Sequence, residues 1–225
     1  MRNRLGLAAL AAAASLLLSG CGTLPPGAAA VVDGAKITRT QVTDLADAQC
    51  AGVAQAAKQG QTAAVSRKQL TQRALGLLID VKLNLAYGKS LGLSPRPTET
   101  AKDFAQIDPL IQALPAQYRT NVAEVFHGWA DGRDLIAQVG EKETGKTLSS
   151  TTSEEILNAG YQKRESWIKT IKIDTDPKYA PGKIGWPGEG DSSVSEPVSS
   201  FAKGATAQSP KATFVDALPS AQRCG

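Results

Sequence analysis

His127 is the side chain with the widest catalytic scope in this sequence, because it is the only histidine among 225 residues and imidazole titrates near neutral pH. It lies in the segment VFHGW and would need an acid, a base or a nucleophile beside it to take part in catalysis. The sequence has no Gly-x-Ser-x-Gly elbow, no Gly-x-x-x-x-Gly-Lys-Ser/Thr phosphate loop and no calcium loop of the EF-hand pattern. We therefore interpret His127 as an ordinary helix residue and expect a protein that is not an enzyme and binds no metal and no cofactor.

The first 20 residues have the composition of an export signal. Arg2 and Arg4 precede the uncharged apolar run LGLAALAAAASLLL, which is shorter than the ~20 residues that span a bilayer. The ending Leu-Ser-Gly-Cys resembles the lipobox of bacterial lipoproteins. That resemblance implies cleavage before Cys21, acylation of its thiol, and a mature protein tethered to the outer face of the cell membrane through residues 21–29. An ordinary secretory signal with a chance cysteine is the alternative.

Cys50 and Cys224 remain if Cys21 carries a lipid. Disulfides persist outside the cytoplasm, and two cysteines allow one intramolecular pairing. We therefore predict a Cys50–Cys224 disulfide that joins the first helix to the C-terminus. Two buried free thiols are the alternative, and two cysteines with one histidine do not make a metal-ligand cluster.

Composition and charge place the mature chain among ordinary globular proteins of one or two domains. The formal net charge of +4 includes Arg2 and Arg4, which would leave with the signal. The remaining charge is too small to predict nucleic acid as a partner.

The segment after the tether reads mostly as helix. Three capping-box patterns, TRTQ at 38–41, SRKQ at 66–69 and TSEE at 152–155, predict helix starts. Apolar spacing predicts helices over about 39–59, from the SRKQ box to just before Gly92, from about 97 onward, over 116–144 and from the TSEE box to about 168, with a break or kink at Pro109. Residues 30–37 read as a strand with a turn at Asp33-Gly34 or as a small hairpin, and residues 171–176 as a second strand. Residues 187–225 read as an extended tail with a short helix near 210–217.

Two of these segments resemble the start and end of the SurA/PrsA chaperone domain. AVVDGAKITRTQV, residues 30–42, is similar to its opening strand and helix start, and IKIDTDPKYAPGKIGW, residues 171–186, to its closing strand. Ala180-Pro181 departs from the pattern, in which Gly directly follows the aromatic residue. The resemblance implies a mainly α domain over residues 30–186, with about five helices and a small two-stranded β element that joins the N- and C-terminal segments.

The family commonly carries an inserted parvulin-type prolyl isomerase domain. The corresponding loop, residues 140–152, is too short to hold one. The resemblance thus implies a membrane-tethered chaperone-like protein without isomerase activity, whose partners are unfolded or newly exported proteins. A structural or assembly lipoprotein with one dedicated cell-envelope partner is the alternative, and an uncharted enzyme is a third. We expect the client-binding surface to include six apolar residues: Phe104, Ile107, Leu110, Tyr118, Phe126 and Trp129.

Overall fold

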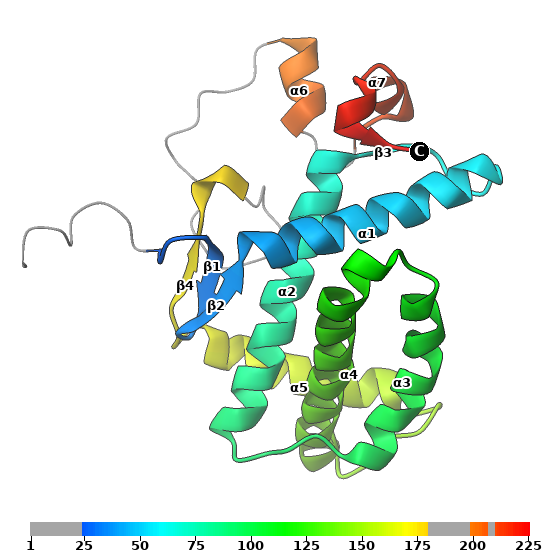
Figure 1. The fold of residues 1–225 in the computed structure, drawn as a ribbon. Helices are drawn as coiled ribbons and strands as arrows, with labels where there is room; N and C mark the ends of the chain where they lie inside the picture. Colours follow the sequence, from blue (N-terminus) through cyan, green and yellow to red (C-terminus); the bar gives the residue numbers. More distant parts are fainter. Residues whose placement is uncertain (1–23, 180–198, 207–209) are drawn as a thin grey trace, which may run out of the picture.

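The computed structural model describes residues 24–179, 199–206 and 210–225 (Figure 1). The mainly α fold predicted from the sequence is confirmed. The signal segment, Cys21 and residues 180–186 at the end of the predicted domain lie outside the described residues. The elements are β1 (Ala28–Val32), β2 (Ala35–Thr38), α1 (Arg39–Lys58), β3 (Val65–Ser66), α2 (Arg67–Ser90), α3 (Pro97–Gln112), α4 (Ala116–Thr144), α5 (Ser153–Ile168), β4 (Ile173–Thr175), η1 (Pro177–Tyr179), α6 (Ser200–Thr206), α7 (Ala212–Asp216), η2 (Ser220–Gln222) and β5 (Arg223–Cys224).

A small antiparallel sheet joins the two ends of the helical body. Its strand order is β2-β1-β4, so the first strand is central and pairs with the last strand of the body. Asp33 and Gly34 both have positive φ, at 47° and 79°, which allows the tight turn between β1 and β2. The hairpin alternative is therefore correct, and the sheet has one strand more than the expected two-stranded element.

The three capping-box patterns form side-chain caps to different degrees. Thr38 and Gln41 form the full reciprocal box at the start of α1, and the Ser66 hydroxyl accepts from the Gln69 N–H at the start of α2. The third predicted helix start is confirmed, since α5 begins at Ser153, but the Thr152 side chain does not cap it. Its hydroxyl instead donates to the Thr147 carbonyl and accepts from the Ser149 N–H, which fixes the preceding loop.

Pro109 does not break α3, contrary to the sequence prediction. The helix continues through it to Gln112. Pro109 is exposed and lies in the last turn, where only the few residues that follow depend on continued helical bonding. The buried side chain of Ile111 packs into the core and holds this last turn in place.

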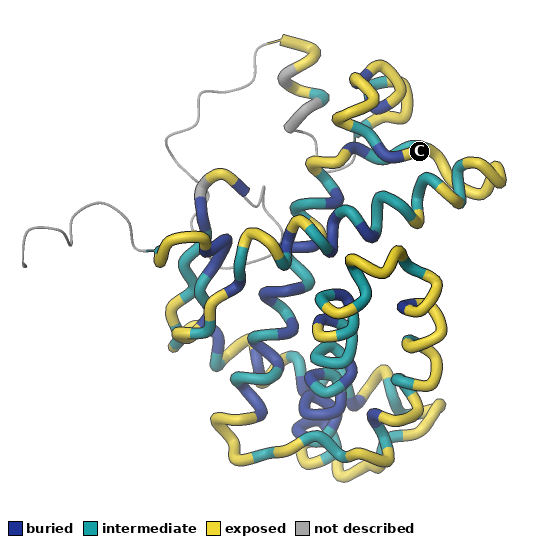
Figure 2. The backbone as a smooth tube through the Cα atoms, in the orientation of Figure 1, coloured by how far each residue is buried: buried dark blue, intermediate teal, exposed yellow. Residues whose placement is uncertain are grey.

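The core runs along α2 and α4. Figure 2 shows buried residues concentrated on these helices, whereas α3 is mostly exposed. Leu75, Leu83 and Ile136 are among the largest fully buried side chains. Among the described residues, no helix has the length and apolar character needed to span a bilayer.

The crossing of α4 and α5 depends on glycines. A Cβ on Gly140 would overlap the backbone of Ile156, and one on Gly160 would overlap the backbone of Ile136. Each helix therefore presents a glycine to an isoleucine of the other, and the two backbones approach more closely than any larger residue would allow.

Two buried charged side chains form hydrogen bonds that link helices of the body. Arg164 of α5 donates to Asp80, at 2.5 Å, and to Asn84, both on α2. Asp134 of α4 accepts from the backbone and guanidinium of Arg96, at 2.7–2.9 Å, and so fixes the start of α3. Burial of these charges is tolerated because both groups form hydrogen bonds, although the Nε of Arg164 has no partner among the described residues.

The C-terminus is attached to α1 through the predicted disulfide. Cys50 and Cys224 lie at disulfide-bonding distance with a Cα–Cα separation of 5.1 Å, and β5 pairs with β3. The short helix predicted near 210–217 is α7, whereas α6 was not predicted. The C-terminal segment is therefore extended only in part.

Candidate functional site

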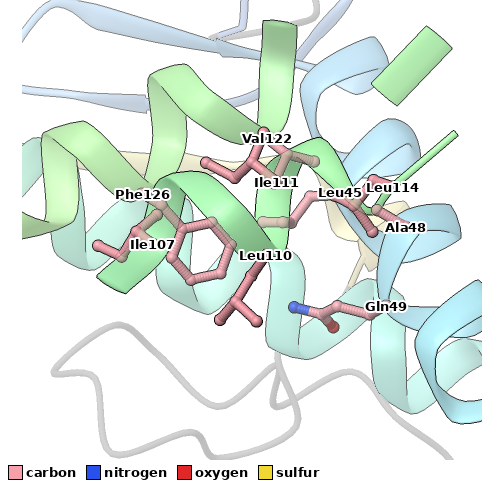
Figure 3. A pocket seen from close by; sticks show the side chains of 9 residues that line it. All are labelled: Leu45, Ala48, Gln49, Ile107, Leu110, Ile111, Leu114, Val122 and Phe126. Carbon is pink, nitrogen blue, oxygen red and sulfur yellow. The ribbon is translucent and has the colours of Figure 1, made fainter. Parts of the chain in front are cut away.

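An apolar pocket lies between α1, α3 and α4 (Figure 3). Its volume is about 240 Å³. Eight of its nine lining residues are apolar, and Gln49 is the only polar one; the set is Leu45, Ala48, Gln49, Ile107, Leu110, Ile111, Leu114, Val122 and Phe126. Such a lining recognises hydrocarbon and offers no convergent polar groups for chemistry.

The α3 wall of the pocket is the most exposed. Leu110 leaves 71% of its surface accessible, and Thr100 and Ile111 are the buried residues of α3. In Figure 3 the Leu110 side chain lies at the edge of the pocket, close to Phe126 and Ile107. Exposed apolar side chains beside an apolar hollow form a surface that gains free energy when a partner covers it.

Two polar bridges tie α4 to the neighbouring helices beside this pocket. Asp44 of α1 accepts from the side-chain amide of Asn121. Asp108 of α3 lies 2.6 Å from Nε2 of His127. Both contacts run from α4 to a helix that also lines the pocket, and the pair of Asp108 with His127 is exposed to solvent.

His127 lies at the protein surface among aromatic and acidic neighbours. Its ring is 4.4 Å from that of Phe104, and its side chain is 38% exposed. Burial raises the pKa of the Asp131 carboxyl above its ordinary value, and the His127 charge opposes that rise. Within the described residues, His127 contacts the Asp108 carboxylate and the Phe104 ring, neither of which is a hydroxyl or thiol nucleophile.

The structure brings three of the six predicted client-binding residues together. Ile107, Leu110 and Phe126 line the pocket. Phe104 stacks on His127 instead, and Tyr118 packs against the main core. Trp129 is half-buried and is not part of the pocket lining.

The sequence prediction missed six lining residues: Leu45, Ala48, Gln49, Ile111, Leu114 and Val122. Three of them come from α1, for which the sequence predicted a helix but no binding surface. The helical spacing of Leu45 and Gln49 places them on one face, but no local signal tells a face that lines a pocket from one that fills a core.

Side chains that commonly bind metals are not clustered in the described part of the chain. No group of three or more histidine, cysteine, aspartate or glutamate side chains within the described ranges is arranged to hold a metal ion. Four of the acidic residues described above have arginine, asparagine or histidine side chains as partners: Asp44, Asp80, Asp108 and Asp134.

Comparisons with known proteins give no relative for this chain. No protein-family model matches the sequence, and neither a curated protein nor a solved structure is significantly similar to it. We therefore infer function from the residues and their geometry.

Proposed function

We propose that this protein is a membrane-tethered chaperone-like protein that holds apolar segments of newly exported proteins on the outer face of the cell membrane, without prolyl isomerase activity. The apolar pocket between α1, α3 and α4, with its exposed Leu110 wall, is the observation that carries the proposal. The Leu-Ser-Gly-Cys sequence supports the tether, and the pairing of β1 with β4 brings together the two segments that resemble the SurA/PrsA domain.

The size of the pocket suits single side chains of an extended segment. Small-molecule sites measure roughly 300–1,000 Å³, and this pocket is smaller. Burial of apolar surface contributes about 25 cal/mol per Å², and it demands little shape complementarity. Binding is therefore expected to be weak and tolerant of sequence, which suits a protein that must release its clients.

Suppression of aggregation by the full chain in phosphatidylcholine nanodiscs tests this proposal. An unrelated unfolded protein should aggregate less in its presence than with empty nanodiscs, and a parallel proline-isomerisation assay should show no acceleration. Leu110→Asp should remove most of the suppression because it places a charge at the edge of the pocket. Leu91→Asp is the matched control, since Leu91 is a half-exposed leucine at the end of α2, outside the pocket.

The alternative outcomes are distinct. Absence of suppression would contradict the general chaperone function and favour one dedicated cell-envelope partner. Equal loss in both leucine variants would show that suppression depends on surface hydrophobicity and not on the pocket.

A further inference from the structure

The first of the two carboxylate bridges borders the α1 side of the pocket. Asp44 accepts a hydrogen bond from Asn121, and the residues that follow them, Leu45 and Val122, both line the pocket. Because an asparagine amide is neutral, this bridge satisfies the carboxylate with a hydrogen bond and leaves its negative charge in place.

The second bridge borders the α3 side in the same manner. Asp108 contacts His127, and the residues that precede them, Ile107 and Phe126, both line the pocket. The Asp108 side chain is 52% exposed, so it can be reached from solvent. Each bridge is thus formed by two residues, and each of these residues is adjacent in sequence to one that lines the pocket.

These carboxylates differ from their neighbours on the same helices. Asp47 of α1 pairs with Arg67, and Asp103 of α3 pairs with Arg133. Within the described part of the chain, neither Asp44 nor Asp108 has a lysine or arginine within ion-pair distance. The negative charge of Asp44 on the α1 side is therefore uncompensated, and that of Asp108 on the α3 side is compensated only when its partner His127 is protonated.

One arginine lies near the remaining side of the pocket. The Nε of Arg119 donates to the Leu114 carbonyl at 2.8 Å, in the turn between α3 and α4. Leu114 lines the pocket there. A cation at this turn repels other cations, so positive charges of a bound segment are favoured beside α1 and α3.

From this arrangement we infer that the pocket prefers segments in which an apolar side chain is flanked by lysine or arginine. This inference rests on the proposed chaperone function and specifies its client class. Apolar burial supplies the binding, and the two carboxylates select among apolar segments by charge. Pairs between exposed charges typically change an equilibrium about 1.5- to 5-fold each, and salt screens them.

Three nine-residue peptides with the same central Leu-Phe pair test the inference. They carry two flanking lysines, glutamines or glutamates, and fluorescence anisotropy measures their binding to the full chain in phosphatidylcholine nanodiscs. The lysine peptide should bind about fivefold more tightly than the glutamine peptide, and the glutamate peptide most weakly. Salt at 0.5 M should remove most of the difference because it screens exposed charges within a few ångströms.

Two isosteric variants test whether Asp44 and Asp108 cause the preference for the lysine peptide. Asp44→Asn and Asp108→Asn should each lower the lysine preference to about twofold. Glu165→Gln makes the same change in net charge on the exposed side of α5, outside the pocket, and should leave the preference unchanged.

Each contrary result has its own meaning. Equal affinity for the three peptides, or a preference for glutamate, overturns the charge specificity and leaves the chaperone proposal standing. A lysine preference that both aspartate variants retain also overturns the inference. Failure of all three peptides to bind overturns the inference together with apolar binding in the pocket.

Discussion

The two sides of α4 are covered by helices that pack in opposite ways. On one side α5 lies so close that glycines meet the backbone of the other helix, and a buried arginine links α5 to α2. On the other side α3 buries few residues, and an apolar pocket remains between it, α1 and α4. The comparison indicates that one side of the molecule provides rigidity and the other an adaptable apolar surface.

The largest expected effect comes from the α4–α5 crossing. Gly140→Ala should lower the free energy of unfolding by at least about 3 kcal/mol, because the added methyl group overlaps the Ile156 backbone and forces the helices apart. Gly52→Ala is the control, since a Cβ on Gly52 of α1 meets nothing within 4 Å. It should be stabilising by up to about 1 kcal/mol. Urea unfolding followed by circular dichroism measures both, and equal midpoints would show that the crossing is not tightly packed.

The second test compares the contributions of two arginines to stability, one on the α5 side of α4 and one on the α3 side. Arg164→Leu should cost about 2–3 kcal/mol, because it leaves Asp80 and Asn84 without their cation in a largely buried position. Arg133→Leu removes the more exposed pair with Asp103 and should cost under about 1 kcal/mol. The same urea experiment separates them, and the contrast between the two sides fails if Arg133 proves the more important.

The third test measures whether polar contacts stabilise the sheet as they do the α5 side of the molecule. The Lys178 N–H and the Arg39 guanidinium both donate to Asp176, and these hydrogen bonds lower the pKa of its carboxyl. Asp176→Asn should therefore cost about 1 kcal/mol at pH 7. A lowered pKa stabilises the fold above the ordinary value of about 3.9 and loses that contribution as pH falls through the lower folded value. The difference between wild type and variant should be constant above that ordinary value and shrink as pH falls below it, and a difference that stays constant at acid pH would contradict the assignment.

The smallest expected effect belongs to the pocket wall. Leu110→Ala should change the free energy of unfolding by less than about 0.5 kcal/mol, because the side chain is 71% exposed. Leu83→Ala, at a fully buried position of α2, should cost about 2–5 kcal/mol. Backbone amides of α3 should also exchange with deuterium faster than those of α4. Slow exchange in α3 would remove the distinction between the two sides.

Much of the fold could be predicted from local signals. The Thr38 capping box and the regular apolar spacing of α2 identify their helices because a helix start and a helical face are encoded within a few residues. The cap predicted at Thr152 and the break predicted at Pro109 are absent, because a local pattern does not show the contacts that these residues make in the fold. The hydroxyl of Thr152 is engaged by its own loop, and Pro109 stands where few helical bonds follow it.

The pocket could be predicted only in part because it depends on how three helices converge. Phe126 and Phe104 have similar local signals, yet one lines the pocket and the other stacks on His127. The polar contacts of Asp44 and Asp108 span 77 and 19 residues of sequence, so neither bridge leaves a pattern that can be recognised in the chain alone.

The disulfide also sets an order of events during synthesis. Cys50 must remain without this partner until Cys224 has been made, because Cys224 lies 174 positions further along the chain. Before then Cys21, 29 positions before Cys50, is the only other cysteine in the sequence with which Cys50 could pair. The bond therefore closes only after all the helices between the two cysteines have been made, which makes its oxidation a chemical record that this part of the chain has emerged.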